Sequence, residues 1–212
     1  VEDVSQPPPS DAGMWTIDPK AAPDAGATVR IGFECGVPVS VDGLALGPVE
    51  LVESLNALGA AHGVGRIDIV ENRLVGMKSR GLYETPGGTL LFEALRTLRS
   101  PTIERDTLDL CERPAPEYAR TVYHGLRFHP NRAAIDGLFT EAMSRATGEV
   151  TVDLYKGSAR AMAATSPHSL YRDDLASFTM GAGYEPADSE GFVRLFGLPG
   201  TVSAAARRGS EA

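Results

Sequence analysis

Apolar and polar residues alternate in several short segments of the chain, which is the pattern of strands that bury one face. The first segment is 28–34, where Val29, Ile31 and Phe33 alternate with polar or small residues. A second apolar run follows at 37–41, after a glycine that interrupts the first. Two runs so close in sequence predict a hairpin or a meander.

The same pattern returns twice further along the chain. Residues 66–71 and 74–79 are predicted as two short strands, with Asn72 and Arg73 as the turn between them. In 149–165, apolar residues alternate on one side of a Lys-Gly turn, and a partner strand is predicted on the other. Three hairpins predict an antiparallel sheet, because strands joined by short turns run in opposite directions.

Apolar residues at helical spacing fill the segments between the hairpins. Pro48 is predicted to open one helix, because proline is tolerated at the first helical position. Helices mixed with hairpins, without strict alternation, predict an α+β fold in which helices pack against the antiparallel sheet. The helices are predicted at 48–59, 89–101, 102–110, 118–123, 130–146 and 186–197, with an irregular or short helical piece at 169–178.

The two ends of the chain differ in composition from the middle. Residues 1–27 contain three consecutive prolines, which favour an extended arm, and Trp15 is predicted to pin this arm to the body. Residues 201–212 form a small tail rich in alanine and arginine, predicted to be helical and too short to fold alone. The predicted organisation is an arm over 1–27, a main domain over 28–200 and a C-terminal tail over 201–212.

Composition narrows the classes of function. The net charge of −8 argues against a nucleic-acid groove, which needs a basic surface. No apolar run approaches the length of a membrane span, and no signal peptide opens the sequence. Cys35 and Cys111 have no metal-binding spacing, which favours free thiols in a reducing, cytoplasmic compartment. The sequence starts at Val1 and does not open like a folded domain, so a piece of a longer protein is expected.

Familiar catalytic and metal-binding motifs are missing from the sequence. It contains no phosphate-binding loop, dinucleotide fingerprint or nucleophile elbow, and no histidine pair with metal-ligand spacing. No catalytic residue and no metal site are therefore predicted. Residues 65–88 are richer in polar groups than a structural hairpin needs. Of two carboxylate pairs, Asp173-Asp174 is interpreted as a turn or helix cap, and the other, Glu71 with Glu84, lies in this polar segment.

Glu71 and Tyr83 are the candidate binding residues of the polar segment. Glu71 ends a predicted strand, where a carboxylate can accept a charge-assisted hydrogen bond from a ligand ammonium group. The alternative is an internal ion pair with Arg73, Lys78 or Arg80, and the residue pattern alone favours this alternative. Tyr83 is interpreted as a loop residue whose hydroxyl either meets a ligand or caps the core.

Longer stretches of the sequence resemble one known family. The segment GVGRIDIVENRLVGMKSRGLYETPGGTLLFEAL, residues 63–95, resembles the corresponding segment of the argininosuccinate synthases. The resemblance extends to FECGVPVSVDG at 33–43, PVELVESLN at 48–56, SPHSLY at 166–171 and YEPADSEGFVRLFGLPG at 184–200. Family members begin with an ATP-binding half that has no counterpart in this sequence. The chain thus resembles the C-terminal synthetase and oligomerisation half.

The resemblance implies an AMP-forming ligase. In this family ATP activates the ureido oxygen of citrulline, and the amine of aspartate then attacks to give argininosuccinate, AMP and pyrophosphate. Carried onto the matching motifs, Glu71 and Tyr83 are expected to contact citrulline, which reverses the preference for an ion pair at Glu71. Arg73, Lys78 and Arg80 are expected to shape the electrostatics of the site. ATP with Mg²⁺ is expected on the missing N-terminal half, and no cofactor on this chain.

The resemblance also implies partners. These are citrulline, the N-terminal nucleotide-binding domain and further copies in a homotetramer, in which the tail 201–212 takes part. The isolated chain is expected to be inactive, because it lacks groups for the ATP phosphates and a well-placed acid or base. One alternative is a non-catalytic synthetase-like domain that serves oligomerisation or amino-acid binding. Another is a related ligase with a different ureido or amine substrate.

Overall fold

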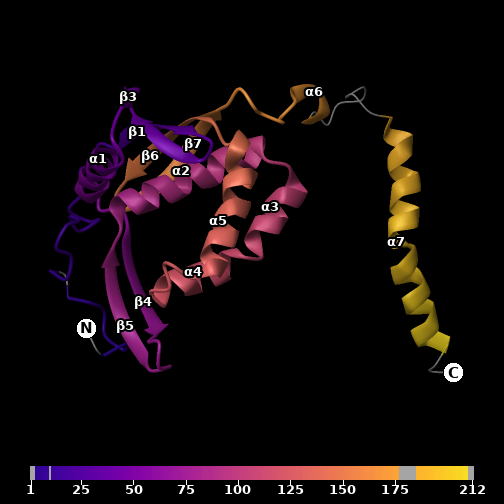
Figure 1. Ribbon diagram of the computed structural model, residues 1–212, viewed down its shortest axis with the longest axis horizontal. Coiled ribbons are helices and arrows are strands. Elements are labelled where there is room, and N and C mark those ends of the chain that lie inside the picture. Colours follow the sequence, from indigo (N-terminus) through magenta and orange to yellow (C-terminus); the bar gives the residue numbers. More distant parts are fainter. Residues whose placement is uncertain (1–2, 10, 177–184, 210–212) are drawn as a thin grey trace. The chain divides into compact units, whose positions relative to one another are not determined.

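A computed structural model describes residues 3–9, 11–176 and 185–209 of the chain (Figure 1). The chain divides into two units, Val1–Leu170 and Tyr171–Ala212, and each is described by itself. The first unit contains a sheet, a separate hairpin and the helices that hold them. The described residues of the second unit form two helices. Among the described residues, no helix is both long enough and apolar enough to span a membrane.

The sheet joins two of the predicted hairpins edge to edge. Strand β1 (Ala27–Glu34) pairs antiparallel with β2 (Val37–Val41) on one side and with β6 (Gly148–Tyr155) on the other. The outer strands β3 (Leu44–Ala45) and β7 (Ser158–Thr165) complete the order β3-β2-β1-β6-β7. Every pairing is antiparallel, which confirms the predicted α+β class and the sheet of hairpins.

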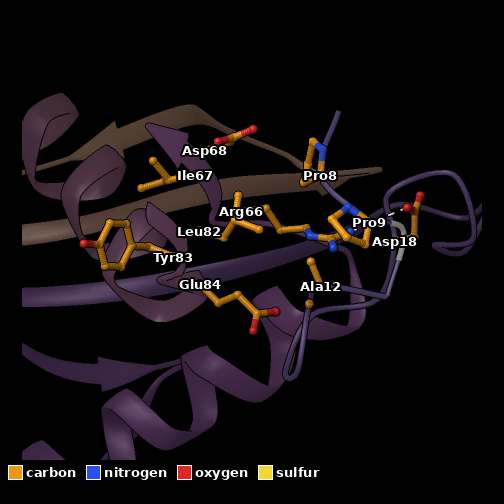
Figure 2. A pocket seen from close by; sticks show the side chains of 11 residues that line it. Pro8, Pro9, Ala12, Asp18, Arg66, Ile67, Asp68, Leu82, Tyr83 and Glu84 are labelled. Carbon is orange, nitrogen blue, oxygen red and sulfur yellow. Dashed lines mark ion pairs between the residues drawn. The ribbon is translucent and has the colours of Figure 1, made fainter. Parts of the chain in front are cut away.

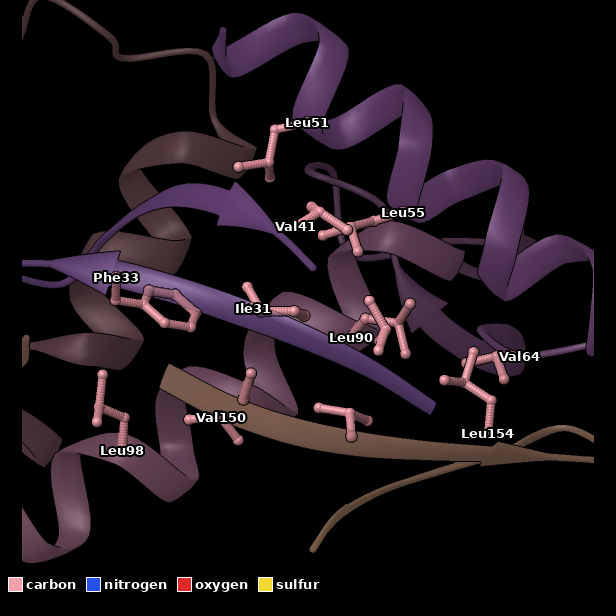
Figure 3. Close-up of a cluster of buried hydrophobic side chains, with 13 residues drawn as sticks. Ile31, Phe33, Val41, Leu51, Leu55, Val64, Leu90, Leu98, Val150 and Leu154 are labelled. Carbon is pink, nitrogen blue, oxygen red and sulfur yellow. The ribbon is translucent and has the colours of Figure 1, made fainter. Parts of the chain in front are cut away.

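The core lies between this sheet and two helices, α1 (Pro48–Ala61) and α2 (Pro86–Thr102), and Figure 3 shows its side chains. The alternation in β1 and β6 brings their apolar residues to the helices, with Ile31 opposite Val150. Leu55 of α1 is fully buried among them. Burying one such side chain stabilises the fold by roughly 1.5–3 kcal/mol. The buried cluster consists of Val29, Ile31, Phe33, Val41, Leu51, Leu55, Val64, Leu90, Ala94, Leu98, Val150, Val152 and Leu154.

The boundaries of α2 differ from the predicted ones. The helix begins at Pro86 instead of Thr89 and continues through Pro101 to Thr102. Pro86 occupies the first helical turn, where the missing N–H group has no helical partner to lose. Pro101 lies in the last turn, so its missing N–H group interrupts the hydrogen-bond ladder only at the end of the helix.

Three further helices follow α2 in the first unit. They contact one another, and the rings of Tyr118 and Phe139 meet edge to face with centroids 5.8 Å apart. The predicted helix over 130–146 is confirmed except for its last turn, which is a 3₁₀ helix. The elements are α3 (Arg105–Glu112), α4 (Ala115–Tyr123), α5 (Pro130–Ala142) and η1 (Met143–Arg145).

The third predicted hairpin exists, but its second strand lies elsewhere. β4 (Arg66–Asn72) pairs with β5 (Lys78–Glu84) as a separate two-stranded ribbon. The second strand begins at Lys78 instead of the predicted Leu74 and continues to Glu84, because residues 73–77 form the loop. The Arg73 amide donates to the Met77 carbonyl at 2.7 Å, and Gly76 has a φ of 87°. The apolar residues of this loop resemble a strand in sequence, yet they are exposed at the tip.

The second unit contains α6 (Asp173–Ala176) and α7 (Pro186–Gly209). The helix predicted at 186–197 and the helical tail form one 24-residue helix with Pro199 inside it. The prediction of a helical tail is thus confirmed as far as residue 209, whereas the predicted break before the tail is wrong. Residues 177–178 of the irregular piece, 184 of the closing motif and 210–212 of the tail lie outside the described residues.

Candidate functional site

The two predicted binding residues meet on one face of the β4–β5 hairpin. The register places Glu71 opposite Ser79 and Tyr83 opposite Ile67, with all four side chains on the same face. The Tyr83 hydroxyl donates a hydrogen bond to Glu71 Oε1 at 2.5 Å. We call this surface, formed by Ile67, Ile69, Glu71, Ser79, Gly81 and Tyr83, the front face of the hairpin.

Glu71 forms no ion pair among the described residues, so the alternative of an internal ion pair with Arg73, Lys78 or Arg80 is not observed. Arg73 donates to the Ser79 hydroxyl at 3.0 Å, and Arg80 pairs with Asp68. Arg80 belongs to the opposite face of β5, because side chains alternate along a strand. Within the described part of the chain, the Glu71 carboxylate is therefore stabilised by the Tyr83 hydroxyl alone, and its side chain is half-buried at an exposed surface.

Tyr83 lies in β5, which corrects the expectation of a loop residue. Its side chain runs back along the strand over Gly81 to reach Glu71. The hydrogen bond to Glu71, followed by burial and the Glu71 charge, raises the pKa of Tyr83 above its ordinary value. The phenol therefore stays protonated at neutral pH and acts as a donor to the carboxylate.

A tyrosine of α4 supports the same end of the hairpin. The Tyr123 hydroxyl, at the last residue of the helix, donates to the Asn72 carbonyl at 3.1 Å. Asn72 directly follows Glu71, so this contact fixes the backbone that carries the carboxylate. This contact could not be predicted from the sequence, because residues 72 and 123 are far apart in the chain and no short motif connects them.

The back face of the hairpin holds the N-terminal arm through Glu84. Its carboxylate accepts hydrogen bonds from the amides of Met14 (2.8 Å), Trp15 (3.1 Å) and Thr16 (2.7 Å) and from the Thr16 hydroxyl (2.6 Å). Burial by itself would raise the pKa of Glu84, but these hydrogen bonds outweigh it and lower the pKa to about 2. We call this contact the Glu84 clasp.

The clasp corrects two predictions. Trp15 was expected to pin the arm by its ring, yet its side chain is 66% exposed, and the arm is held by backbone amides instead. Glu71 and Glu84 do not form a carboxylate pair, because they occupy opposite faces and opposite ends of the hairpin. The other pair, Asp173-Asp174, opens α6, as the interpretation of a turn or helix cap predicted.

Arg80 makes a second connection to the arm. Its guanidinium group binds both oxygens of Asp68, at 2.8 and 2.6 Å, and donates to the carbonyls of Asp3 (2.8 Å) and Gln6 (2.9 Å). The hydrogen bond from Arg80 lowers the pKa of Asp68. Between arm and hairpin lies an open pocket of about 190 Å³, lined in part by Pro9, Arg66 and Leu82 (Figure 2).

The two faces of the hairpin thus differ in what they present. Its front face presents an unpaired carboxylate with a tyrosine donor, and its back face binds the arm. A carboxylate and a phenol at an exposed surface can bind a cationic or polyfunctional small molecule, whereas they supply no phosphate site. Among residues 3–9, 11–176 and 185–209, no cluster of three histidine, cysteine, aspartate or glutamate side chains could hold a metal ion.

Comparisons with known proteins point to one family. A family model described as the argininosuccinate synthase C-terminal domain matches residues 1–203. An argininosuccinate synthase of Koribacter versatilis is 49% identical over 199 residues, which cover 94% of this chain and 49% of that protein. The chloroplastic argininosuccinate synthase of Arabidopsis thaliana is 47% identical over 204 residues, which cover 96% of this chain and 41% of that protein.

A third relative gives the same result. The argininosuccinate synthase of a Roseiflexus species is 49% identical over 204 residues, which cover 96% of this chain and 50% of that protein. The chain therefore spans about half the length of the curated relatives it matches. Because the C-terminal domain model covers nearly the whole sequence, the chain belongs to the argininosuccinate synthase family.

Proposed function

We propose that this chain supplies the citrulline-contacting wall of an argininosuccinate synthase. This ligase joins citrulline to aspartate, using ATP, and releases argininosuccinate, AMP and pyrophosphate. Family membership supports the reaction class. The observation that carries the proposal is the hydrogen bond between Tyr83 and Glu71 on an exposed face, where no cationic side chain of the described residues pairs with the carboxylate.

The proposed partner of Glu71 is the α-ammonium group of citrulline. The Tyr83 hydroxyl occupies Oε1 and leaves Oε2 and its lone pairs for a second donor. A hydrogen bond between a carboxylate and an ammonium group is charge-assisted and contributes about 1.5–3 kcal/mol. An exposed front face is compatible with this role, because the incoming ligand excludes the water that would otherwise weaken the interaction.

Tyr83 has the proposed role of orienting Glu71. A carboxylate on a flexible side chain loses rotamer freedom when it binds a ligand, and a hydrogen bond already present in the free protein reduces that cost. The raised pKa of Tyr83 keeps its proton in place, so the donor persists through neutral pH. The contact of Tyr123 with the Asn72 carbonyl fixes the adjacent backbone in the same way.

The remaining parts of the reaction belong to other surfaces. We propose that ATP with its Mg²⁺, and aspartate, bind on a nucleotide-binding half outside this chain, as the family resemblance implies. The relatives are about twice as long as the segment that matches this chain, which is compatible with such a half. No residue of the front face has the chemistry of a phosphate cradle, so the isolated chain is proposed to be inactive. A cytoplasmic location is also proposed.

We further propose that α7 mediates self-association into a homotetramer. This helix exposes large apolar side chains within its own unit, including Phe192 at 64%, Leu195 at 74% and Phe196 at 78%. Large apolar side chains exposed together along one helix are typical of a protein interface. Burying each one stabilises an assembly by roughly 1.5–3 kcal/mol before the cost of association.

The test of the proposal is citrulline binding by the complete synthase that carries this chain. Glu71→Gln removes one charge with little change of shape, and we expect the apparent affinity for citrulline to fall about tenfold or more, with the KM for aspartate unchanged. Glu53→Gln on the exposed side of α1 is the matched control, with the same charge change. Equal citrulline affinity in all three proteins would rule out Glu71 as a ligand contact.

A further inference from the structure

Gly81 occupies an unusual position for a glycine. It lies in the middle of β5, opposite Ile69, where glycine weakens a strand because it has no side chain to pack. Its φ is not positive, unlike that of Gly76 in the loop, so the backbone conformation does not require glycine. A glycine is therefore explained here by the lack of room for a side chain, and not by the backbone conformation.

The space above Gly81 is filled by Tyr83. A Cβ atom added at residue 81 would lie 2.5 Å from Cε2, 2.8 Å from Cζ and 2.9 Å from the hydroxyl oxygen of Tyr83. Carbon atoms that are not bonded do not approach so closely, so an alanine here forces the ring to move. The three atoms nearest to that position all belong to Tyr83.

The route over Gly81 is what lets Tyr83 reach Glu71. Tyr83 and Ser79, the residue opposite Glu71, are four residues apart on β5, which is about 13 Å along a strand. A side chain standing upright from the sheet would not cover this separation. The ring instead lies along the strand, and its hydroxyl arrives 2.5 Å from Glu71 Oε1.

We propose that Gly81 is a positioning residue for the substrate site, because its missing side chain forms the channel in which the Tyr83 ring lies to orient Glu71. The ligand part of this inference depends on the proposed citrulline site. The geometric part does not, since it concerns only the contact between Tyr83 and Glu71. A side chain at residue 81 then acts on the substrate only through Tyr83.

A double-mutant cycle in the complete synthase separates this role from a general structural one. Gly81→Ala is expected to weaken citrulline binding about 10- to 100-fold, as loss of a hydrogen bond to a charged group does. Tyr83→Ala is expected to have a similar effect. Adding Gly81→Ala to Tyr83→Ala should have no further effect, because the ring that it strikes is gone. Gly88→Ala, where the new Cβ would meet only Thr85 at 3.8 Å, is the control.

Tyrosine titration of the same proteins by ultraviolet absorbance tests the geometry without citrulline. The contribution of Tyr83, obtained by difference from Tyr83→Ala, should titrate above ordinary tyrosine in the parent protein and in Gly88→Ala. In Gly81→Ala it should return toward the ordinary pKa. If Gly81→Ala shifts the Tyr83 titration but citrulline binding does not depend on Glu71, the channel over Gly81 is supported and the proposed citrulline site is refuted.

Three results would overturn the inference. One is an unchanged Tyr83 titration in Gly81→Ala. Another is a loss of citrulline affinity from Gly81→Ala that is equally large in the parent protein and in the Tyr83→Ala variant. The third is misfolding of Gly81→Ala that persists with Tyr83→Ala, because the damage would then not arise from contact with the ring. Folding that fails in Gly81→Ala alone and returns in the double variant supports the channel.

Discussion

Replacing Glu84 by glutamine should release the N-terminal arm from the hairpin. The carboxylate accepts from three backbone amides and from one hydroxyl, and glutamine offers a single neutral acceptor in the same place. A pKa lowered from 4.5 to about 2 corresponds to at most about 3 kcal/mol, at 1.36 kcal/mol for each pKa unit. We expect Glu84→Gln to lower the free energy of unfolding by about 1–3 kcal/mol at neutral pH.

The pH dependence gives this prediction its sign. Because the folded-state pKa of Glu84 is depressed, its contribution is present above the unfolded value of 4.5 and is lost as the pH falls toward about 2. The difference in unfolding free energy between the parent and Glu84→Gln should therefore be largest near neutral pH and shrink between pH 4.5 and 2. Other carboxylates titrate in the same range, so the difference between the two proteins is the quantity to follow.

Two assays measure this prediction. Urea unfolding at several pH values gives the difference in free energy. Trp15 is the only tryptophan and its amide is part of the clasp, so its fluorescence anisotropy reports the arm directly. We expect lower anisotropy in Glu84→Gln than in the parent at neutral pH. Equal anisotropy in the two proteins would contradict the role of Glu84 in holding the arm. A stability difference that stays constant from neutral pH to pH 2 would contradict it as well.

Three further outcomes follow from the structure. Leu55→Ala should lower the free energy of unfolding by about 2–5 kcal/mol, measured by urea denaturation, because Leu55 is fully buried in the core; a loss below 1 kcal/mol would contradict this packing. Tyr123→Phe should raise the KM for citrulline in the complete synthase several-fold and leave the aspartate KM unchanged, because it removes the hydrogen bond to Asn72; equal effects on both substrates would exclude a local role. Phe196→Asp should shift the sedimentation equilibrium toward smaller species, whereas an unchanged distribution would remove α7 from the interface.

Much of the fold could be predicted from local patterns. The strands over 28–34, 37–41 and 150–155 follow a period of two, because one side of each faces the core formed with α1 and α2. Sequence patterns detect this kind of burial well. The β4–β5 hairpin is separate from the core sheet, and it exposes Ile67 and Ile69 on its front face. Because neither face of the hairpin is buried in the core, the spacing of its apolar residues does not predict which residues of the two strands pair.

The register error had a consequence for the site. With the second strand placed at 74–79, Tyr83 fell outside the hairpin and its contact with Glu71 could not be derived. The resemblance to the family implied that Glu71 and Tyr83 both contact the ligand, but it did not predict that they bind each other. Gly81 was the available signal, because a glycine inside a strand often marks a close approach.

The Glu84 clasp illustrates what single-sequence reasoning misses. Three of its four partners are backbone amides, and amides are present at every position except proline, so residue types do not reveal them. A lone tryptophan in an arm suggests an apolar anchor on its face, yet the ring of Trp15 is mostly exposed. Contacts between segments so far apart in the sequence depend on the fold, so they are recognised only in the three-dimensional structure.

The proposed binding of the substrate's α-ammonium group by Glu71 is tested most directly by comparing two ligands in two proteins. Affinities are measured for citrulline and for an analogue with hydrogen in place of that ammonium group, in the complete synthase and in its Glu71→Gln variant. We predict that the parent enzyme prefers citrulline by about tenfold or more, and that the variant loses most of this preference. A preference that is equally strong in both proteins would contradict the claim.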